Sequence, residues 1–324
     1  MPTTFEGKTV HHFSGLIDHR VVEIFQLPDR TFQAAENINH TLRFITENCQ
    51  GLNSFLKRYI GNPINGRPIT STVFELAKKE HETDRRRITG DLYIKHLFFT
   101  AYQTDEMSSD KDYSKDERDL LVATSLLHDL IEMKRKSKDT PDYNVGNFIN
   151  LLKNAKNVDG TPYMKDWQPR EIRKLVTMVS LLTPPDKPPD MAIQHWRKVK
   201  WEDFRRIINM SSKDVKKSES EIDFQDEESE FTDYEAERIA QMIIDIKVAE
   251  IFTNLRETAD DVHLGRDGMN DIPDMKHMVD RYKVFKERIN FLKIIPMKTN
   301  YRLKMDEDLK VLAQLVGDQE FKAI

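Results

Sequence analysis

The sequence predicts an all-α protein with a sizeable hydrophobic core. Apolar residues recur at three- and four-residue steps along most of the chain, and runs that alternate apolar and polar residues are few. Only 11 of the 324 residues are glycine, which suits a helical fold better than one rich in turns. Hydrophobic residues make up 38% and charged residues 32% of the chain, a balance typical of a soluble globular protein that buries a core.

The charge and the cysteine content limit the classes of partner and compartment. A net charge of -5 argues against non-specific binding to nucleic acid. Cys49 is the single cysteine and cannot form an internal disulfide, which favours a reducing compartment. The N-terminus lacks a basic segment followed by an apolar one, and no run approaches the ~18 apolar residues of a membrane-spanning helix. We therefore expect a cytoplasmic protein that binds neither nucleic acid nor a membrane.

Residues 1–70 are expected to form a separate helical module. Apolar residues between Phe32 and Ile60 follow a helical spacing, and the stretch Gly-Asn-Pro-Ile-Asn-Gly-Arg-Pro at 61–68 interrupts it. This interruption is the expected boundary of the main domain. The expected domains are residues 1–70, residues 71–295 and a C-terminal tail at 296–324.

The main domain is expected to consist of helices with recognisable start and stop signals. The first begins near Thr72, after hydroxyl side chains that can cap it, and ends in the arginines at 85–87. The next carries the apolar sequence Leu-Tyr-Ile-Lys-His-Leu-Phe-Phe-Thr-Ala-Tyr at 92–102. Further helices are expected at 116–133, 145–156, 169–182, 235–256 and 276–295, with a short one at 308–315. Prolines just after residue 182 stop the helix that ends there.

The segment at 211–233 is rich in acidic residues and serine and has few apolar anchors. Such a composition is typical of a solvated insertion that does not pack against the core. We expect a flexible linker here, and the alternative is an acidic lid.

The helix at 116–133 carries polar residues in the middle of an apolar face. Leucines and an isoleucine recur at helical spacing around His128, Asp129 and Glu132. Asp129 lies about 100° and Glu132 about 40° around the helix from His128, so all three share one side. Burying an imidazole and two carboxylates without partners costs several kcal/mol each. We therefore expect a divalent metal to neutralise them.

Two other helices offer further ligands for the same metal. His96 lies on an apolar helix, and Glu250 interrupts the apolar face of the helix at 235–256. Two imidazoles and two carboxylates form a mixed nitrogen and oxygen site that suits Mn²⁺, Fe²⁺ or Zn²⁺. Such an ion lowers the pKa of a water and polarises a phosphoryl oxygen, and Glu132 can accept the proton of that water. The alternatives are a metal-free polar network and a salt bridge at Glu250, and Asp245 is a fallback ligand that fits a surface acid better.

Several segments of the chain have the order and spacing of one family's motifs. The sequence Arg-Ile-Thr-Gly-Asp-Leu-Tyr-Ile-Lys-His at 87–96 is similar to R-x-S-G-E-P-Y-I-x-H, and Leu-Leu-His-Asp-Leu-Ile-Glu at 126–132 is similar to LLHDxxED. The segment at 176–183 is similar to one that ends in VT, and Lys-Val-Ala-Glu-Ile-Phe-Thr-Asn-Leu-Arg at 247–256 is similar to K-L-A-D-R-L-x-N-M-R. These motifs resemble those of the HD-domain phosphohydrolases. The closest likeness is to the RelA/SpoT-type domain that removes pyrophosphate from the alarmone (p)ppGpp, and it covers roughly residues 73–295.

The resemblance implies an HD-domain helical bundle and a set of site residues. It implies that four ligands hold a divalent metal, usually Mn²⁺ in this family, and that Glu132 belongs to the catalytic acid pair. Arg87 would contact the guanine base with its planar guanidinium, and Thr183 and Asn254 would face the nucleoside. The implied metal ligands are His96, His128, Asp129 and Glu250.

Five positions differ from the family pattern, and two of them, Leu92 and Leu97, stand where the family has proline. Glu250 stands where the family has aspartate, Ile88 where it has lysine, and Met133 where it has the second catalytic acid. The first hypothesis is a metal-dependent hydrolase that removes pyrophosphate from the 3′ position of a guanosine alarmone. One alternative is hydrolysis of another small nucleotide, a deoxynucleoside triphosphate or a cyclic nucleotide. The other is a catalytically weak nucleotide-sensing module marked by Met133, because acid–base assistance is typically worth about 10²–10⁴ in rate.

Overall fold

The computed structural model describes most of the chain from residue 68 onward and three short segments before it. The described ranges are residues 3–5, 8–17, 20–26, 68–82, 93–137, 142–156, 167–188, 190–224, 229–263 and 275–318, with a few single residues between them.

The chain divides into two compact units that interleave along the sequence. Unit 1 comprises Met1–Arg58, His81–Phe99 and Val248–Ile324, and unit 2 comprises Tyr59–Glu80 and Thr100–Lys247. The division falls within α4 (Tyr93–Met107) and within α11 (Asp233–His263), so each unit contains part of both helices. The consecutive boundaries expected at residues 70 and 295 stay predictions.

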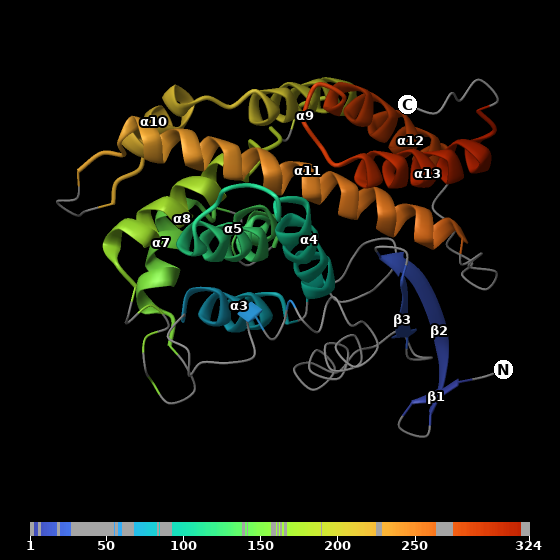
Figure 1. Cartoon of the computed structure of the whole chain (residues 1–324), viewed down its shortest axis with the longest axis horizontal. Helices are drawn as coiled ribbons and strands as arrows, with labels where there is room; N and C mark the ends of the chain where they lie inside the picture. The colour runs from blue at the N-terminus through green and yellow to red at the C-terminus, as the bar shows by residue number, and fades with distance from the viewer. Residues whose placement is uncertain are drawn as a thin grey trace. The chain divides into compact units, whose positions relative to one another are not determined.

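Unit 2 is a helical bundle built around α5 (Lys115–Leu127). Asp119 and every residue after it in α5 are buried, and the helix packs against α3 (Pro68–Glu80) and α8 (Pro169–Leu182) (Figure 1). Helix α8 also packs against α7 (Val145–Asn154) and α10 (Ser212–Glu221). Unit 2 contains in addition α6 (Leu130–Lys136) and α9 (Ile193–Ile208).

Local signals explain where these helices begin and end. Ser114 and Glu117 form a capping box at the start of α5, so the first turn satisfies its own backbone N–H groups. Pro169 occupies the first turn of α8, where its missing N–H costs nothing, and Thr183 caps the other end just before two prolines. The bounds of α8 therefore agree with the predicted helix at 169–182.

The acidic segment contains a packed helix, α10, where we expected a flexible linker. A capping box begins this helix, and its Val215 is fully buried. The carboxylate of Glu219, only 2% exposed, accepts hydrogen bonds from Arg173 at 3.0 Å and from the Phe231 N–H at 2.9 Å. Two residues of this segment, Val215 and Glu219, are buried, and Glu219 is also hydrogen-bonded. The composition of the segment does not reveal these contacts.

Unit 1 begins with a three-stranded antiparallel sheet in the order β1–β2–β3 (Figure 1). Strand β1 (Thr3–Phe5) pairs with β2 (Lys8–Ile17), and β2 pairs with β3 (Arg20–Gln26). These strands differ from the helical module expected for residues 1–70. The sequence of β3 explains the difference in part, because four of its seven residues are valine, isoleucine or phenylalanine, which favour extended backbone. The helices expected between residues 32 and 60 lie mostly outside the described residues.

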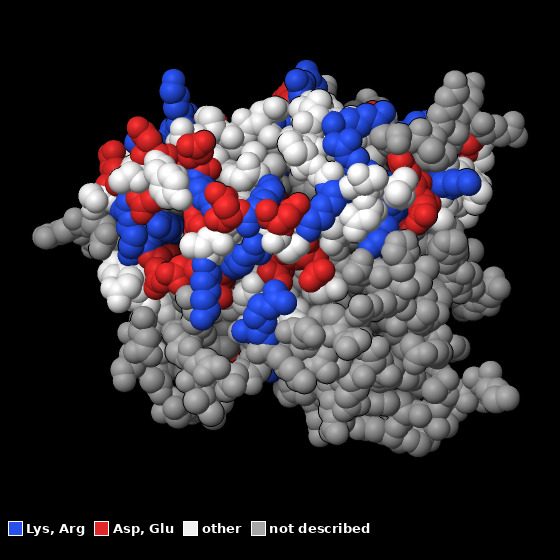
Figure 2. Space-filling view, in the orientation of Figure 1, with Lys and Arg blue, Asp and Glu red and all other residues white. Residues whose placement is uncertain are grey.

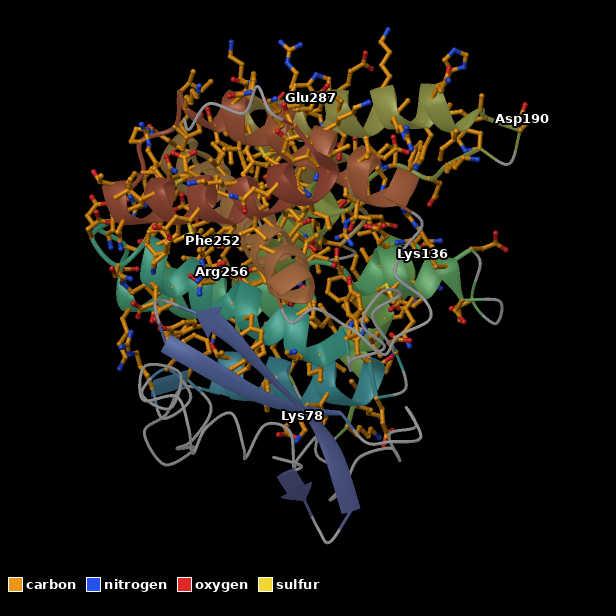
Figure 3. All side chains as sticks on the ribbon, turned by 90° about the vertical axis from the view of Figure 1, so that its right-hand side faces the viewer. Lys78, Lys136, Asp190, Phe252, Arg256 and Glu287 are labelled. Atoms are coloured by element: carbon orange, nitrogen blue, oxygen red, sulfur yellow. The ribbon has the colours of Figure 1, made fainter. Side chains whose placement is uncertain are left out.

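The helical part of unit 1 joins the end of α11 to two further helices. Helices α12 (Met275–Leu292) and α13 (Thr299–Val316) pack against each other. Phe252 and Arg256 lie one turn apart on α11 (Figure 3). The Phe252 ring meets the Tyr301 ring of α13 edge-on, with ring centroids 5.5 Å apart.

The expected all-α fold class is confirmed for the helical bundle, and the sheet at residues 3–26 is an addition to it.

A buried ion pair also connects α11 to α13. Arg256 donates to both carboxylate oxygens of Asp308, at 3.0 and 3.1 Å, and both side chains are less than one-tenth exposed. Burial raises the pKa of Asp308 from 3.8 to about 6, although the charge and hydrogen bonds of Arg256 oppose the rise.

The raised pKa of Asp308 predicts a pH-dependent contribution to stability. A folded pKa above the unfolded one means that protonation favours folding, so the contribution is complete below pH 3.8 and is lost as the pH rises through about 6. At about 1.4 kcal/mol per pKa unit, the effect is at most about 3 kcal/mol. Urea unfolding of the wild type and of Asp308→Asn at pH 4.5 and pH 7.5 measures this contribution. The wild type should exceed Asp308→Asn in free energy of unfolding by more at pH 4.5 than at pH 7.5. An equal difference at both pH values would contradict the raised pKa.

Candidate metal centre

The His128–Asp129 pair lies at a break between two helices of unit 2. Helix α5 ends at Leu127 and α6 begins at Leu130, so the single helix expected at 116–133 is two helices. Asp129 has φ -98° and ψ -2°, which interrupts the regular helix, while the apolar spacing continues on both sides. The break places an imidazole at the C-terminal end of α5 and a carboxylate at the N-terminal end of α6. A helix N-terminus favours a negative charge, so the position suits an ionised Asp129.

The His128 ring is buried and held in one orientation. Only 1% of His128 is exposed, and its Nδ1 lies 2.7 Å from the backbone carbonyl oxygen of Ser125. A carbonyl can only accept, so Nδ1 carries the proton and Nε2 carries the lone pair of the neutral ring. Nε2 lies 3.3 Å from Oδ2 of Asp129. The pair therefore presents one imidazole nitrogen and one carboxylate oxygen close together, which is the chemistry of a metal ligand pair.

Glu132 follows in the first turn of α6, among lysines. Its side chain is 20% exposed and forms an ion pair with Lys136, one turn later on the same helix. Lys200 of α9 places its Nζ 3.9 Å from the same Oε1 atom. Two lysine ammonium groups therefore lie near the Glu132 carboxylate. Met133 comes next and is half-buried, so a thioether stands where the resemblance implies a second acid.

Thr183, expected to face a nucleoside, caps the C-terminal end of α8. Its hydroxyl donates to the Val179 carbonyl oxygen at 2.7 Å, and its side chain is half-buried. Arg135 of α6 donates to the Pro184 carbonyl oxygen at 3.5 Å and pairs with Asp186 at 3.1 Å. These contacts hold the segment after α8 against α6, the helix that carries Glu132.

In unit 1, His96 is a buried residue of α4 with a carboxylate behind it. It is 1% exposed, and its Nδ1 lies 3.2 Å from Oε2 of Glu257 on α11. The Tyr93 ring packs edge-on against the imidazole, with ring centroids 5.7 Å apart. Glu257 was not among the residues predicted from sequence. It lies seven residues after Glu250 and hence on the same face of α11, which is the signal that could have found it.

The other predicted residues of α11 belong to different units: Glu250 and Asn254 to unit 1, and Asp245 to unit 2. Glu250 and Asn254 are both half-buried, and the Asn254 amide donates to Glu250 Oε1 at 3.5 Å. Asp245, the fallback ligand, is neither exposed nor a surface acid. It is 8% exposed and accepts hydrogen bonds from Lys111 at 2.6 Å, Tyr113 at 2.7 Å and Gln241 at 3.2 Å. These three donors satisfy the buried Asp245 carboxylate without a metal. Arg87 lies outside the described residues.

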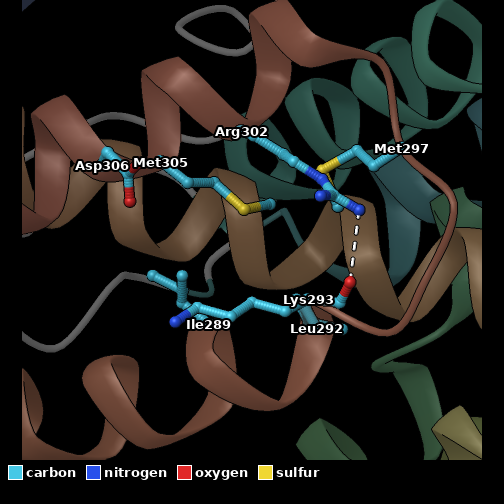
Figure 4. Close-up of a pocket in the computed structure, with 7 residues that line it drawn as sticks. All are labelled: Ile289, Leu292, Lys293, Met297, Arg302, Met305 and Asp306. Carbon is cyan, nitrogen blue, oxygen red and sulfur yellow. Dashed lines mark hydrogen bonds between the residues drawn. The ribbon is translucent and has the colours of Figure 1, made fainter. Parts of the chain in front are cut away.

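A pocket in unit 1 is a poor candidate for a nucleotide site. It holds about 260 Å³ of empty space, and apolar and long charged side chains line it (Figure 4). Small-molecule sites usually measure ~300–1,000 Å³. Arg302 at its edge donates to the carbonyl oxygens of Ile295 at 2.9 Å and Lys293 at 3.3 Å, so its guanidinium serves the backbone. None of the predicted site residues lines this pocket.

The described surface gives no sign of a polyanion-binding face in the view of Figure 2. Lysine and arginine are interspersed there with aspartate and glutamate on the described residues. Within the same described part of the chain, no helix has both the length and the apolar character that crossing a membrane requires.

No family model, no curated protein and no solved structure matches the chain.

Proposed function

We propose that this protein is a metal-dependent phosphohydrolase of HD-domain type, and that its substrate is a guanosine 3′-pyrophosphate such as (p)ppGpp. The observation that carries the proposal is the His128–Asp129 pair. The Ser125 carbonyl orients Nδ1, and Nε2 lies 3.3 Å from the Asp129 carboxylate. A backbone carbonyl or a carboxylate behind the imidazole is the usual support of a metal-ligating histidine.

His96 shows the same local arrangement, because Glu257 lies behind its Nδ1 as Ser125 lies behind that of His128. We propose that His96 is a third ligand of the metal that His128 and Asp129 hold. We propose Glu250 as a fourth ligand. This mixed set of nitrogen and oxygen donors fits Mn²⁺, the ion that the family resemblance implies, and equally Fe²⁺ or Zn²⁺. When bound, such an ion polarises a phosphoryl oxygen and lowers the pKa of a water.

The chain's own residues would then supply orientation and proton transfer. Glu132 would accept the proton of the attacking water, and Lys136 and Lys200 lie beside its carboxylate. Attack at the 3′ phosphorus would release pyrophosphate. We keep the roles that the resemblance implies for the nucleoside-binding residues. The nucleoside would contact Thr183 and Asn254, and the guanine base would contact Arg87. The substrate is a small nucleotide, and we place the activity in the cytoplasm.

A nucleotide-sensing module is the second candidate, and Met133 favours it. A thioether accepts no proton at neutral pH, so this position cannot assist Glu132. The module would bind the nucleotide at the same centre and turn it over weakly or not at all.

One experiment separates these functions. The full chain is loaded with Mn²⁺ and incubated with (p)ppGpp, deoxynucleoside triphosphates and cyclic nucleotides, and the products are resolved by ion-exchange chromatography. We expect release of pyrophosphate from (p)ppGpp, abolished by a chelator and restored by Mn²⁺. Turnover of another nucleotide instead would reassign the substrate, and binding without turnover would establish the sensor. If the protein neither binds nor hydrolyses any member of the panel, the proposal fails.

A further inference from the structure

Glu257 is a carboxylate that the resemblance to HD-domain enzymes does not include. It lies on α11 with its side chain 18% exposed, and its Oε2 is 3.2 Å from Nδ1 of His96. Its partner is 1% exposed, and Tyr93 packs against the ring. Holding a carboxylate against a buried imidazole costs desolvation, and the hydrogen bond to the ring nitrogen offsets part of that cost.

The contact constrains which nitrogen of His96 can bind a metal. A carboxylate accepts, so the ring nitrogen that faces it carries a proton. In the neutral ring the lone pair is then on Nε2, on the side of the imidazole away from Glu257. The same logic holds for His128, where the Ser125 carbonyl is the acceptor at 2.7 Å. His96 differs in having a carboxylate as the acceptor, and such a partner behind the ring supports an imidazole as a metal ligand.

We propose that Glu257 is a positioning residue: it holds His96 in the Nδ1–H tautomer and aims Nε2 at the divalent metal. This inference rests on the proposed function, because it assigns a role to the imidazole within the metal centre. Glu257 does not itself touch metal or substrate in this assignment. Glu250, seven residues earlier on the same face of α11, keeps the role of ligand.

The first test reads the tautomer without any metal. In chelator-treated protein labelled with ¹⁵N-histidine, the ring nitrogen shifts of His96 distinguish the two neutral tautomers and the cation; His96→Gln identifies its signals. We expect the Nδ1–H tautomer in the wild type and in Glu237→Gln, which changes an exposed glutamate of the same helix. Glu257→Ala should shift the population toward Nε2–H. An unchanged tautomer in Glu257→Ala, or a doubly protonated ring in the wild type, would overturn the proposal.

The second test reads the metal directly. Titration calorimetry with Mn²⁺ should show an affinity about 10–100-fold lower for Glu257→Ala than for the wild type, with Glu237→Gln unchanged. Glu257→Gln, whose amide oxygen can still accept from Nδ1, should lose less. Thermal melting establishes that each variant is folded. Equal Mn²⁺ affinity of the wild type and Glu257→Ala would overturn the positioning role. If the wild type binds no divalent metal, the proposed function fails, while the tautomer measurement still decides whether Glu257 orients the ring.

Discussion

Replacing His128 with alanine is expected to remove bound metal and all metal-dependent hydrolysis. His128 is buried at the junction of α5 and α6, and its Nε2 and the Asp129 carboxylate form the ligand pair of the proposed centre. Losing the ligand itself should weaken Mn²⁺ binding by more than the about 10–100-fold that loss of a hydrogen-bond partner behind a ligand costs. Metal content after dialysis, measured by elemental analysis, should fall from about one ion per chain to near zero.

The matched control is His195→Ala. His195 is an exposed histidine of α9, so it tests whether loss of any imidazole changes the metal content. We expect metal content and activity of His195→Ala to equal those of the wild type. Thermal melting of both variants separates loss of metal from loss of fold, because alanine at the buried position also leaves a cavity. If folded His128→Ala keeps wild-type metal content, His128 is not a ligand.

The helices that sequence predicts best are those with signals at their ends. Pro169 at the start and two prolines after Thr183 define α8, and its bounds agree with the prediction. The prediction of one helix at 116–133 is correct about the helical spacing and wrong about its continuity. The periodicity of apolar side chains does not reveal that a single residue, Asp129, leaves helical geometry. The sequence shows that His128 and Asp129 are close neighbours. It does not show that a helix break turns them toward each other.

Helices in charge-rich segments are hard to predict from sequence, because a few buried side chains can hold them in place. Helix α9 was not predicted, since six of its sixteen residues are basic or histidine in the stretch from His195 to Arg206. Its buried side chains are only Phe204, Ile207 and Ile208. A few buried residues can hold a helix whose average composition is that of a solvated segment. The site shows the same limit: Glu257 could be suspected from its seven-residue spacing to Glu250, but its contact with His96 depends on how α4 and α11 pack.

Replacing Glu219 with alanine is expected to destabilise unit 2 by about 3–5 kcal/mol, because it leaves Arg173 as a buried cation without its carboxylate. Glu219 also accepts the Phe231 N–H, at 2.9 Å to one oxygen and 3.2 Å to the other. The Arg173 guanidinium lies over the Phe224 ring, 4.5 Å from its centroid, and so cannot turn toward solvent without losing that contact. Urea unfolding at pH 7 measures the loss as a lower midpoint with an unchanged slope.

The control for Glu219 is Glu221→Ala, two residues later on the same helix. Glu221 is 66% exposed and its ion pair with Lys217 is long, at 3.9 Å, so its loss should change the free energy of unfolding by no more than about 0.5 kcal/mol. A local readout follows from the same contacts. The lysines of α10 should become sensitive to trypsin in Glu219→Ala at urea concentrations that leave the wild type intact. A loss below 1 kcal/mol in Glu219→Ala, with α10 still protected, would mean that Val215 and Phe231 hold this helix and that the buried ion pair contributes little beyond offsetting its own desolvation.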